Sequence, residues 1–368
     1  MVYMANSNLT AAKNAKNDEF YTQYHDIQKE IAAYLEFNPD VFRDKTILLP
    51  CDDPEWSNFT KFFAQNFEKF GLKKLISTSF ASESKNYKTN YQPTLFEMDS
   101  PEFDTKKTKV KGKIFTLTRD KTDDKKINIE DLEWHYLKGD GDFRSDEIKK
   151  LRDEADIIIT NPPFSKFREF LAWIVEANKQ FLIIGNMNAI TYKEVFPLIK
   201  ANKIWLGVSS GAREYIKPDG TFQKMGNTIW FANIDHGRRH QNFPLMAETD
   251  VIKFGTKKPF LKYDNYDAIE VSSVKYIPSD YKGVMGVPIS FLDKYSPGQF
   301  EILGTSDNGL VDDELKITPG LTQKFVDDYY KAGGTGAYKE GNPTAGIYID
   351  GVAKMAYKRI FIKRKEEK

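Results

Sequence analysis

The sequence predicts an α/β protein with a doubly wound, mainly parallel sheet, followed by a mixed, strand- and loop-rich C-terminal region. Up to about residue 235, short apolar runs typical of buried parallel strands alternate with segments of helical periodicity. From about residue 236 the chain is instead rich in Tyr, Lys, Gly and turn residues. We therefore expect two domains, 1–236 and 237–368, with residues 84–134 as an insertion in the first domain.

The composition agrees with a folded chain of one large or two ordinary domains, since 40% of its 368 residues are hydrophobic and 27 are Phe. A single cysteine excludes an intramolecular disulfide and fits a reducing, cytoplasmic location. No apolar run is long enough to cross a bilayer, so we expect no membrane partner. The formal net charge of +1 neither requires nor excludes nucleic acid, because a local basic face would be sufficient.

The predicted strands of the first domain share short runs of apolar, often β-branched residues. They are Thr46–Pro50, Leu75–Phe80, Lys113–Thr118, Ala155–Thr160, Phe181–Gly185, Ile204–Gly207 and Thr228–Phe231. The predicted helices place apolar residues at helical spacing, and they cover residues 27–35, 59–70, 146–152, 167–175 and 192–201. This alternation of strands and helices favours a mainly parallel sheet.

The stretch Asp156–Phe164 joins a buried strand to an abrupt stop, with the sequence Asp-Ile-Ile-Ile-Thr-Asn-Pro-Pro-Phe. Pro162 and Pro163 cannot continue a sheet ladder, so the strand must end at about Asn161. Ser165 can then cap the following helix. Asn161 is therefore expected at the carboxyl end of a parallel strand, where open α/β sheets bind their ligands.

The residues that end this strand, Asn-Pro-Pro-Phe, are suited to binding an amine. Two consecutive prolines remove two backbone donors, so the turn presents carbonyl oxygens without competing N–H groups. The Asn161 side-chain oxygen and the Pro162 carbonyl can hold both hydrogens of an exocyclic amine and leave its lone pair free to attack. Phe164 adds a flat apolar face on which a base can stack. The alternative is a proline turn that merely joins a strand to a helix.

Two acidic loops follow predicted strands of the same domain. Pro50 ends the first strand, and Asp52 and Asp53 stand where a nucleotide-binding fold usually has a glycine-rich cofactor loop. These carboxylates could receive an ammonium group of a cofactor, or they could form a solvated turn or a helix cap. After residue 137, an acid of the Gly-Asp-Gly-Asp segment, Asp140 or Asp142, could accept an amine from a cofactor ring, although Asp-Gly also makes a good tight turn.

Four stretches together resemble the EcoRI-type family of adenine-specific DNA methylases, in the gamma arrangement of adenine-N6 DNA methyltransferases. They are Lys16–Thr22, Cys51–Ser57, Thr160–Phe164 and Gly286–Tyr295. The catalytic motif of such amino-methyltransferases is (Asp/Asn/Ser)-Pro-Pro-(Tyr/Phe/Trp), which matches Asn-Pro-Pro-Phe here. The chain departs from the wider pattern in lacking a glycine-rich first loop and an acid at the end of the second strand, where Glu83 is the nearest candidate for the cofactor ribose.

The resemblance implies a Rossmann-like methyltransferase sheet and a site-specific DNA adenine-N6 methyltransferase that acts on a flipped-out adenine. It assigns catalysis to the motif residues Asn161, Pro162, Pro163 and Phe164. It assigns contacts with the cofactor, S-adenosylmethionine, to Tyr21, Thr22, Pro50, Asp52, Asp53, Asp140, Asp142 and Phe143. The implied role is restriction–modification, with a cognate endonuclease as a functional but not physical partner, or an orphan protective or epigenetic mark.

The resemblance also makes double-stranded DNA the expected partner and residues 237–368 the target-recognition region. In the basic stretch near the chain end, Lys358, Arg359, Lys363 and Arg364 are candidates for contacts with the phosphate backbone. The alternative is that these charges protect a solvated sheet edge from pairing. We expect no metal, because His236 and His240 have no acidic partners that complete a metal motif and are expected at the surface.

Two other functions fit the same motif. Methylation of RNA adenine or of a protein glutamine amide would use the same grip on an amino group. A non-catalytic DNA-binding protein could also be built on this scaffold, although the intact Asn-Pro-Pro-Phe sequence argues against it.

Overall fold

The structure is a computed structural model, and it describes residues 21–50, 52, 57–81, 100–121, 127, 129–211, 214–216, 221–306, 321–342, 344, 346–355 and 358–365. The chain forms two compact units. The first comprises Met1–Met187 and Leu206–His236, and the second comprises Asn188–Trp205 and Gly237–Lys368. The assignment of catalysis and target recognition to separate domains stays a prediction.

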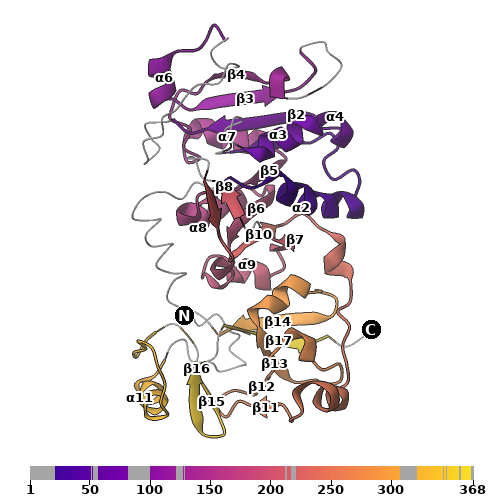
Figure 1. Cartoon of the computed structure of the whole chain (residues 1–368), viewed down its shortest axis with the longest axis vertical. Coiled ribbons are helices and arrows are strands. Elements are labelled where there is room, and N and C mark those ends of the chain that lie inside the picture. Colours follow the sequence, from indigo (N-terminus) through magenta and orange to yellow (C-terminus); the bar gives the residue numbers. More distant parts are fainter. Residues whose placement is uncertain are drawn as a thin grey trace. The chain divides into compact units, whose positions relative to one another are not determined.

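The first unit is built on an eight-stranded sheet with the strand order β4-β3-β2-β1-β5-β6-β10-β7. Figure 1 follows this order from β4 and β3, along one end of the sheet, through β2 and β5 to β6 and β10. The strands are β1 (Thr46–Leu49), β2 (Lys74–Ser79), β3 (Lys113–Leu117), β4 (Glu133–Tyr136), β5 (Ile157–Thr160), β6 (Gln180–Asn186), β7 (Trp205–Ser210) and β10 (Thr228–Ala232). All seven strands predicted for this domain are present in the sheet, whose eighth strand, β4, was not predicted.

The sheet is mixed, whereas the sequence analysis predicted a mainly parallel one. β2, β1, β5 and β6 pair in parallel, while β2–β3, β3–β4 and β6–β10 pair in the antiparallel sense. Parallel neighbours need a long crossover, usually a helix. Between β3 and β4 the described residues include only the single 3₁₀ turn η1 (Ile129–Asp131), so β4 returns beside β3 in the opposite direction.

The described helices of the first unit are α2 (Tyr24–Phe37), α3 (Asn58–Gln65), α4 (Phe67–Phe70), α6 (Thr105–Val110), α7 (Asp146–Glu154), η2 (Phe164–Lys166) and α8 (Phe167–Glu176). The predicted helix over 59–70 is divided at Asn66, whose side chain donates to the Phe62 carbonyl oxygen at 2.9 Å. Gly71, with φ of 64°, ends α4 as expected of a left-handed C-cap. The phenylalanines of α3 and α4 are all buried in the hydrophobic core.

Two predicted helix starts differ from the structure. Ser165 does not cap α8, because the Pro163 carbonyl accepts the Lys166 N–H at 2.9 Å and first closes the η2 turn. The helix predicted over 192–201 is limited to α9 (Phe196–Lys200), after the 3₁₀ turn η3 (Met187–Thr191). Pro197 explains this late start, since proline is tolerated only in the first turn of a helix.

Strand β7, at the end of the large sheet, is held by a buried carboxylate. Glu30 of α2 is fully buried and accepts the N–H groups of Val208 at 2.8 Å and Ser209 at 2.7 Å. The Ser209 hydroxyl donates to the same carboxylate at 2.6 Å. Gly207 permits this approach, because a Cβ there would lie 2.2 Å from the carboxylate. Burial raises the pKa of Glu30, an effect that these hydrogen bonds oppose.

The second unit contains a five-stranded sheet with the order β11-β12-β13-β17-β14 and a separate β15–β16 hairpin. The strands are β11 (Leu261–Lys262), β12 (Ala268–Glu270), β13 (Val284–Pro288), β14 (Phe300–Thr305), β15 (Gly346–Ile349), β16 (Val352–Met355) and β17 (Arg359–Arg364). The described helices besides η3 and α9 are η4 (Gly237–His240), α10 (Glu248–Asp250), η5 (Val251–Thr256), η6 (Val274–Tyr276), η7 (Ile289–Lys294) and α11 (Gln323–Lys331).

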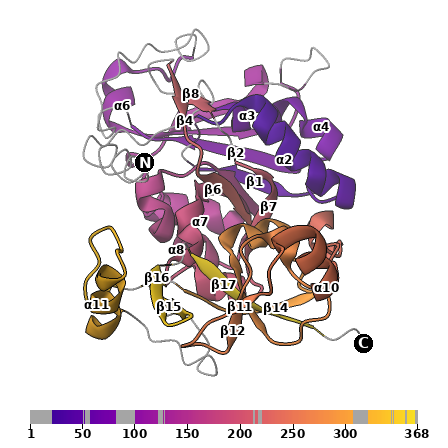
Figure 2. The ribbon, with the colours of Figure 1, turned by 60° about the horizontal axis from the view of Figure 1, so that its bottom comes forward.

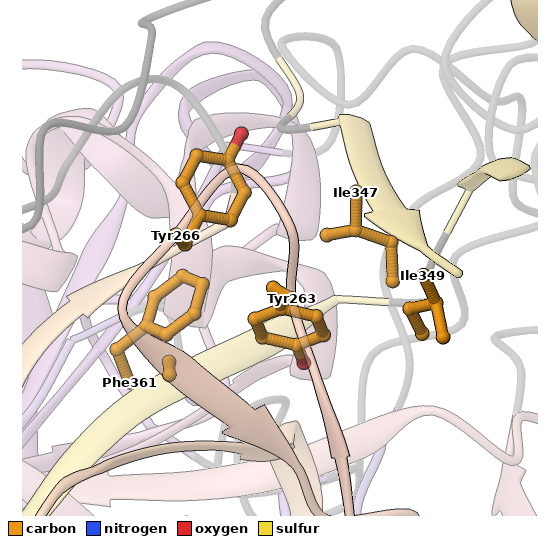
Figure 3. Close-up of a cluster of buried hydrophobic side chains, with 6 residues drawn as sticks. Tyr263, Tyr266, Ile347, Ile349 and Phe361 are labelled. Carbon is orange, nitrogen blue, oxygen red and sulfur yellow. The ribbon is translucent and has the colours of Figure 1, made fainter. Parts of the chain in front are cut away.

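The β15–β16 hairpin is packed against the five-stranded sheet through aromatic and aliphatic side chains. Figure 3 shows Tyr263, Tyr266 and Phe361 facing Ile347 and Ile349 of β15. The Tyr266 hydroxyl also donates to a backbone carbonyl of β15 at 2.8 Å. On its other side, the hairpin is accompanied by α11, which lies beside it in both Figure 1 and Figure 2 and shares a second small core with it.

Within the part of the chain that the structure describes, every helix is too short or too polar to cross a membrane.

Candidate active site

The predicted catalytic turn and the predicted first cofactor loop lie together at the carboxyl ends of two adjacent parallel strands. β1 and β5 pair in parallel, so their ends point to the same edge of the sheet. The Thr160 hydroxyl, fully buried, donates to the Pro50 carbonyl oxygen at 2.7 Å and ties these ends together. Asn161 follows Thr160 directly, and Asp52 follows Pro50 by two residues.

Asp52 is buried at 5% exposure, which disagrees with a solvated turn. Its carboxylate accepts the Ser57 hydroxyl at 2.7 Å, and Ser57 in turn caps α3 through the Phe59 N–H at 3.1 Å. Its backbone carbonyl accepts the hydroxyls of Thr60 and Ser77. Asp52 is therefore held by polar side chains at the start of α3 and in β2, at a position where the usual glycines are missing. Asp53 lies outside the described residues.

The Asn-Pro-Pro-Phe turn leaves β5 with the geometry that two prolines impose. Pro163 has φ of −52° and ψ of 123°, and its carbonyl accepts the Lys166 N–H. Pro162 is buried, while Asn161 and Phe164 are half-buried. Neither proline has an N–H group, so the two prolines contribute hydrogen-bond acceptors to this turn and no donors. The turn thus presents acceptors and an aromatic ring at one point of the sheet edge.

Phe164 packs against a tyrosine that the sequence analysis did not identify. The rings of Phe164 and Tyr215 meet edge to face, with centroids 6.3 Å apart and an interplanar angle of 87°. Tyr215 belongs to the β8–β9 hairpin, formed by Glu214–Ile216 and Phe222–Lys224, and it is fully buried. Burial raises the pKa of Tyr215, so its hydroxyl stays protonated. The short Glu-Tyr-Ile run was the available signal, but a three-residue strand has little periodicity.

The same hairpin holds the predicted N-terminal cofactor segment. Tyr21 exchanges two backbone hydrogen bonds with Ile216, at 2.8 and 3.0 Å. The Asn58 side chain donates to the Thr22 carbonyl oxygen at 2.8 Å. The Thr22 hydroxyl is buried and has no hydrogen-bond partner among the described residues. A buried hydroxyl in this state is suited to a polar atom of a bound molecule.

The structure distinguishes between the two acids predicted to contact a cofactor ring. Asp142 forms a two-point ion pair with Arg144, and these hydrogen bonds hold the pKa of Asp142 below its usual range. The Asp142 carboxylate also lies 3.8 Å from Lys166 Nζ, two residues beyond Phe164. Asp140 carries no ion pair with the described residues, although its carboxylate accepts the Asp142 N–H at 3.1 Å.

The turn that carries these acids packs on the end of β2. The Asp140 carbonyl accepts the Ala81 N–H at 2.8 Å, and Gly141 has φ of 90°. A Cβ at Gly141 would lie 2.3 Å from the Ser79 carbonyl oxygen, so only glycine fits there. Phe143 is buried and packs its ring against aromatic side chains of α8, with the nearest centroid at 5.1 Å. The tight Asp-Gly turn and the acid that could meet a ligand are therefore not exclusive alternatives, because the turn itself carries the acid.

The basic residues predicted to contact DNA are placed differently. β17 lies between β13 and β14, so the predicted alternative of a protected sheet edge is wrong. Arg359 is paired with Glu270 at 3.0 and 3.1 Å, and both side chains are about seven-eighths buried, at 14% and 13% exposure. The Lys358 ammonium donates to the Thr191 hydroxyl at 2.7 Å. Lys363 is exposed and Arg364 is half-buried.

His236 was expected at the surface but is buried at 2% exposure. Its Nε2 lies 3.0 Å from the Leu206 carbonyl oxygen, and its ring meets Tyr34 edge to face at 5.5 Å. The chain after β10 folds back towards the start of β7, which the sequence spacing did not reveal. Among the described residues, no cluster of three or more His, Cys, Asp or Glu side chains could hold a metal ion. Glu83 lies outside the described residues.

Comparisons with known proteins agree on one family. The family model described as adenine-specific methyltransferase EcoRI matches residues 8–365. The chain is 42% identical to the type II methyltransferase M.EcoRI of Escherichia coli, over 81% of this chain and 89% of that protein. It is 35% identical to M.MpnI of Mycoplasma pneumoniae and 36% identical to M.MgeORF184P of Mycoplasma genitalium, each over 79% of this chain and 83% and 84% of the relative.

No solved structure matches the chain. The family match extends over nearly the whole sequence, and it agrees with the Asn-Pro-Pro-Phe turn at the carboxyl end of β5. The chain therefore belongs to the EcoRI family of adenine-specific methyltransferases, and it is a site-specific DNA adenine methyltransferase.

Proposed function

We propose that the chain transfers the methyl group of S-adenosylmethionine to the N6 amine of an adenine extruded from double-stranded DNA. The observation that carries this proposal is the Asn161–Phe164 turn at the end of β5, tied through Thr160 to the loop that contains Asp52. The methylated adenine would serve restriction–modification, with a cognate endonuclease acting on the same DNA. Alternatively, it would be an orphan protective or epigenetic mark.

In this mechanism, the Asn161 side-chain oxygen and the Pro162 carbonyl accept the two hydrogens of the adenine amine. This would leave the nitrogen lone pair free. S-adenosylmethionine, when bound, would supply the methyl group from its sulfonium and leave as the thioether, and the methylated amine would lose one proton. Positioning of the two reactants supplies most of the rate acceleration, because an aligned pair avoids the entropic cost of a bimolecular encounter.

Extrusion of the adenine costs a few kcal/mol of stacking and pairing, which contacts in the pocket must offset. Phe164 provides a ring on which the base stacks. Tyr215 supports this role, because its edge-to-face contact limits the orientations that the Phe164 ring can adopt. The half-buried state of Phe164 leaves part of its ring available to a base.

Three groups of residues are proposed to hold the cofactor. Thr22 offers a buried hydroxyl with no protein partner among the described residues, and Tyr21 is fixed beside it by the β8 strand. Pro50, Asp52 and, from the sequence alone, Asp53 form the loop that would receive the methionyl ammonium group. Asp140, Asp142 and Phe143 form the turn proposed for the adenine ring of the cofactor, and the Arg144 ion pair of Asp142 favours Asp140 as the acceptor.

Residues 237–368 are proposed to recognise the DNA sequence. Of the four basic residues near the chain end, exposed Lys363 is the best placed to meet a phosphate, with half-buried Arg364 next to it. Lys358 and Arg359 already bind Thr191 and Glu270.

The proposal is tested by incubating the protein with labelled S-adenosylmethionine and, separately, duplex DNA, RNA or protein. We expect label in DNA alone, recovered as N6-methyladenine after digestion. Label in RNA adenine or in a glutamine side chain would select one of the alternative amino-methyltransferases. DNA binding without any transfer of label would favour a non-catalytic protein on this scaffold.

A further inference from the structure

The second unit contains an unusual turn that the proposed active site does not use. Residues Val251–Thr256 form the π-helix η5, which directly follows α10, labelled in Figure 2. π-Helical turns are rare and frequently mark functional sites, because an inserted residue weakens the helix and is kept only for a reason. The next residue, Lys257, has φ of 59°, in the left-handed region that favours glycine.

The turn exposes an aromatic ring among lysines. Phe254 is 64% exposed, the highest value of any large hydrophobic side chain in the described residues. Lys253, Lys257 and Lys258 are all exposed. The Lys253 ammonium lies 5.0 Å from the centroid of the Phe254 ring, so charge and ring are presented together. We refer to residues 253–258 as the lysine turn.

The lysine turn has a shape that is fixed by its own contacts. The Lys257 N–H donates to the Ile252 carbonyl oxygen at 2.9 Å, and the Thr256 hydroxyl donates to the Lys258 carbonyl oxygen at 2.6 Å. Gly255 packs directly on Tyr276, since a Cβ there would lie 2.5 Å from the tyrosine ring. The exposed Phe254 is therefore held out by an ordered backbone. Because the backbone of the turn is already ordered, binding a partner costs little additional conformational entropy.

The charges of the lysine turn are unbalanced. Residues 251–263 include four lysines and no Asp or Glu. Lys262 is paired with Asp267 at 2.9 Å, whereas Lys253, Lys257 and Lys258 have no ion pair with the described residues. The Lys257 ammonium donates to the Lys253 carbonyl oxygen at 2.6 Å, which leaves its charge without a carboxylate and two of its hydrogens for other acceptors. A surface with such ammonium groups around an apolar ring is complementary to a polyanion that also offers sugars and base edges.

We propose that the lysine turn is a contact surface for duplex DNA, with its three lysines on phosphates and Phe254 packed against a groove wall. The inference rests on the proposed function, and it moves the main phosphate contacts from the basic residues near the chain end to the lysine turn. Phosphate contacts of this kind supply affinity and register, while the apolar contact adds shape recognition.

The test compares two triple variants of the full-length protein that lose the same charge. In K253Q/K257Q/K258Q the lysine turn is neutralised, whereas in K69Q/K73Q/K203Q three other exposed lysines are changed. Binding of a fluorescent duplex is measured by anisotropy at several salt concentrations. We expect the first variant to lower the slope of log affinity against log salt by about 0.9 for each phosphate that it no longer neutralises, and the second to leave the slope unchanged. Cofactor affinity, measured by calorimetry, is expected to stay the same in both.

F254A supplies an independent measurement. We expect about a tenfold loss of affinity for the duplex with an unchanged salt slope, because an apolar contact releases no counterions. Salt slopes that are equal for the two triple variants would overturn the assignment and leave the turn to a protein or membrane partner. This failure is distinct from a failure of the proposed function, in which the parent protein itself transfers no label to DNA.

Discussion

The Asn161–Phe164 turn and strand β17 both carry residues whose chemistry suggests contacts with a substrate, but the structure uses them in different ways. In the turn, two prolines and the end of β5 fix where the carbonyl groups lie, whatever packs nearby. In and next to β17, the role of each basic side chain depends on residues from other parts of the fold. Glu270 pairs with Arg359, and Thr191 accepts a hydrogen bond from Lys358.

The structural effect of a proline can therefore be predicted from sequence more directly than the role of a charged side chain. A proline acts on its own φ angle and N–H group, so its effect is contained in the sequence. A charged side chain on a strand can face solvent, a ligand or a counter-ion, and the choice depends on residues far away in the chain. Glu270 is 89 positions from Arg359. Four predictions test this comparison, and they follow in order of expected effect.

Asn161→Ala should have the largest effect, because the side chain supplies one of the two proposed acceptors for the amine. We expect turnover to fall by about 100- to 1,000-fold, the scale for one preorganised polar contact in a transition state. Single-turnover methylation of DNA measures it, with circular dichroism to verify the fold. Turnover near that of the parent protein would remove Asn161 from its proposed role.

Arg359→Ala should destabilise the fold, because it leaves the Glu270 carboxylate buried without its counter-ion. We expect a loss of about 2–3 kcal/mol in the free energy of unfolding, somewhat below the range for a fully buried pair. Lys363→Ala, on the same strand but exposed, is the matched control and should change stability by less than about 0.5 kcal/mol. Denaturant unfolding measures both. Equal, small changes would mean that the ion pair is not structural.

Tyr215→Leu should loosen Phe164 while filling much of the same volume. We expect turnover to fall by up to about tenfold, in line with about 0.5–1.5 kcal/mol for an aromatic pair. Tyr215→Phe keeps the ring contact and should stay close to the parent. Fluorescence of a 2-aminopurine at the target position reports base extrusion separately from chemistry. A leucine variant with unchanged turnover and fluorescence would show that Phe164 needs no such support.

Glu30 extends the comparison to a buried charge that is satisfied by backbone donors. Its folded pKa is raised, so between the ordinary and the raised value the folded state binds more protons than the unfolded state. The free energy of unfolding should therefore fall as pH rises through this window, by at most about 1.4 kcal/mol per pH unit, and then level off. Glu30→Gln should remove this slope. Unfolding curves at several mildly acidic pH values, recorded for both proteins, would contradict the assignment if their slopes were equal.

The residue pattern alone was sufficient to predict the α/β class, the seven strands expected in the first domain and the Asn-Pro-Pro-Phe turn at the end of β5. Short β-branched runs favour buried strands, and Pro162 and Pro163 cannot donate hydrogen bonds to a central sheet ladder, so β5 ends at Thr160. It also identified the family, because four short stretches, the Asn-Pro-Pro-Phe motif among them, together resemble the EcoRI-type methylases. These features depend on residues close together in the chain.

Contacts between distant parts of the chain set which strands are antiparallel, which side chains meet and which charges are paired. Tyr215 reaches Phe164, 51 positions earlier in the chain, because the β8–β9 hairpin returns to the edge where β5 ends. Glu270 pairs with Arg359, 89 positions later, and His236 is buried by the return of the chain after β10. In each case the interaction joins segments whose proximity depends on the topology of the sheet or on the path of a loop, which local periodicity does not specify.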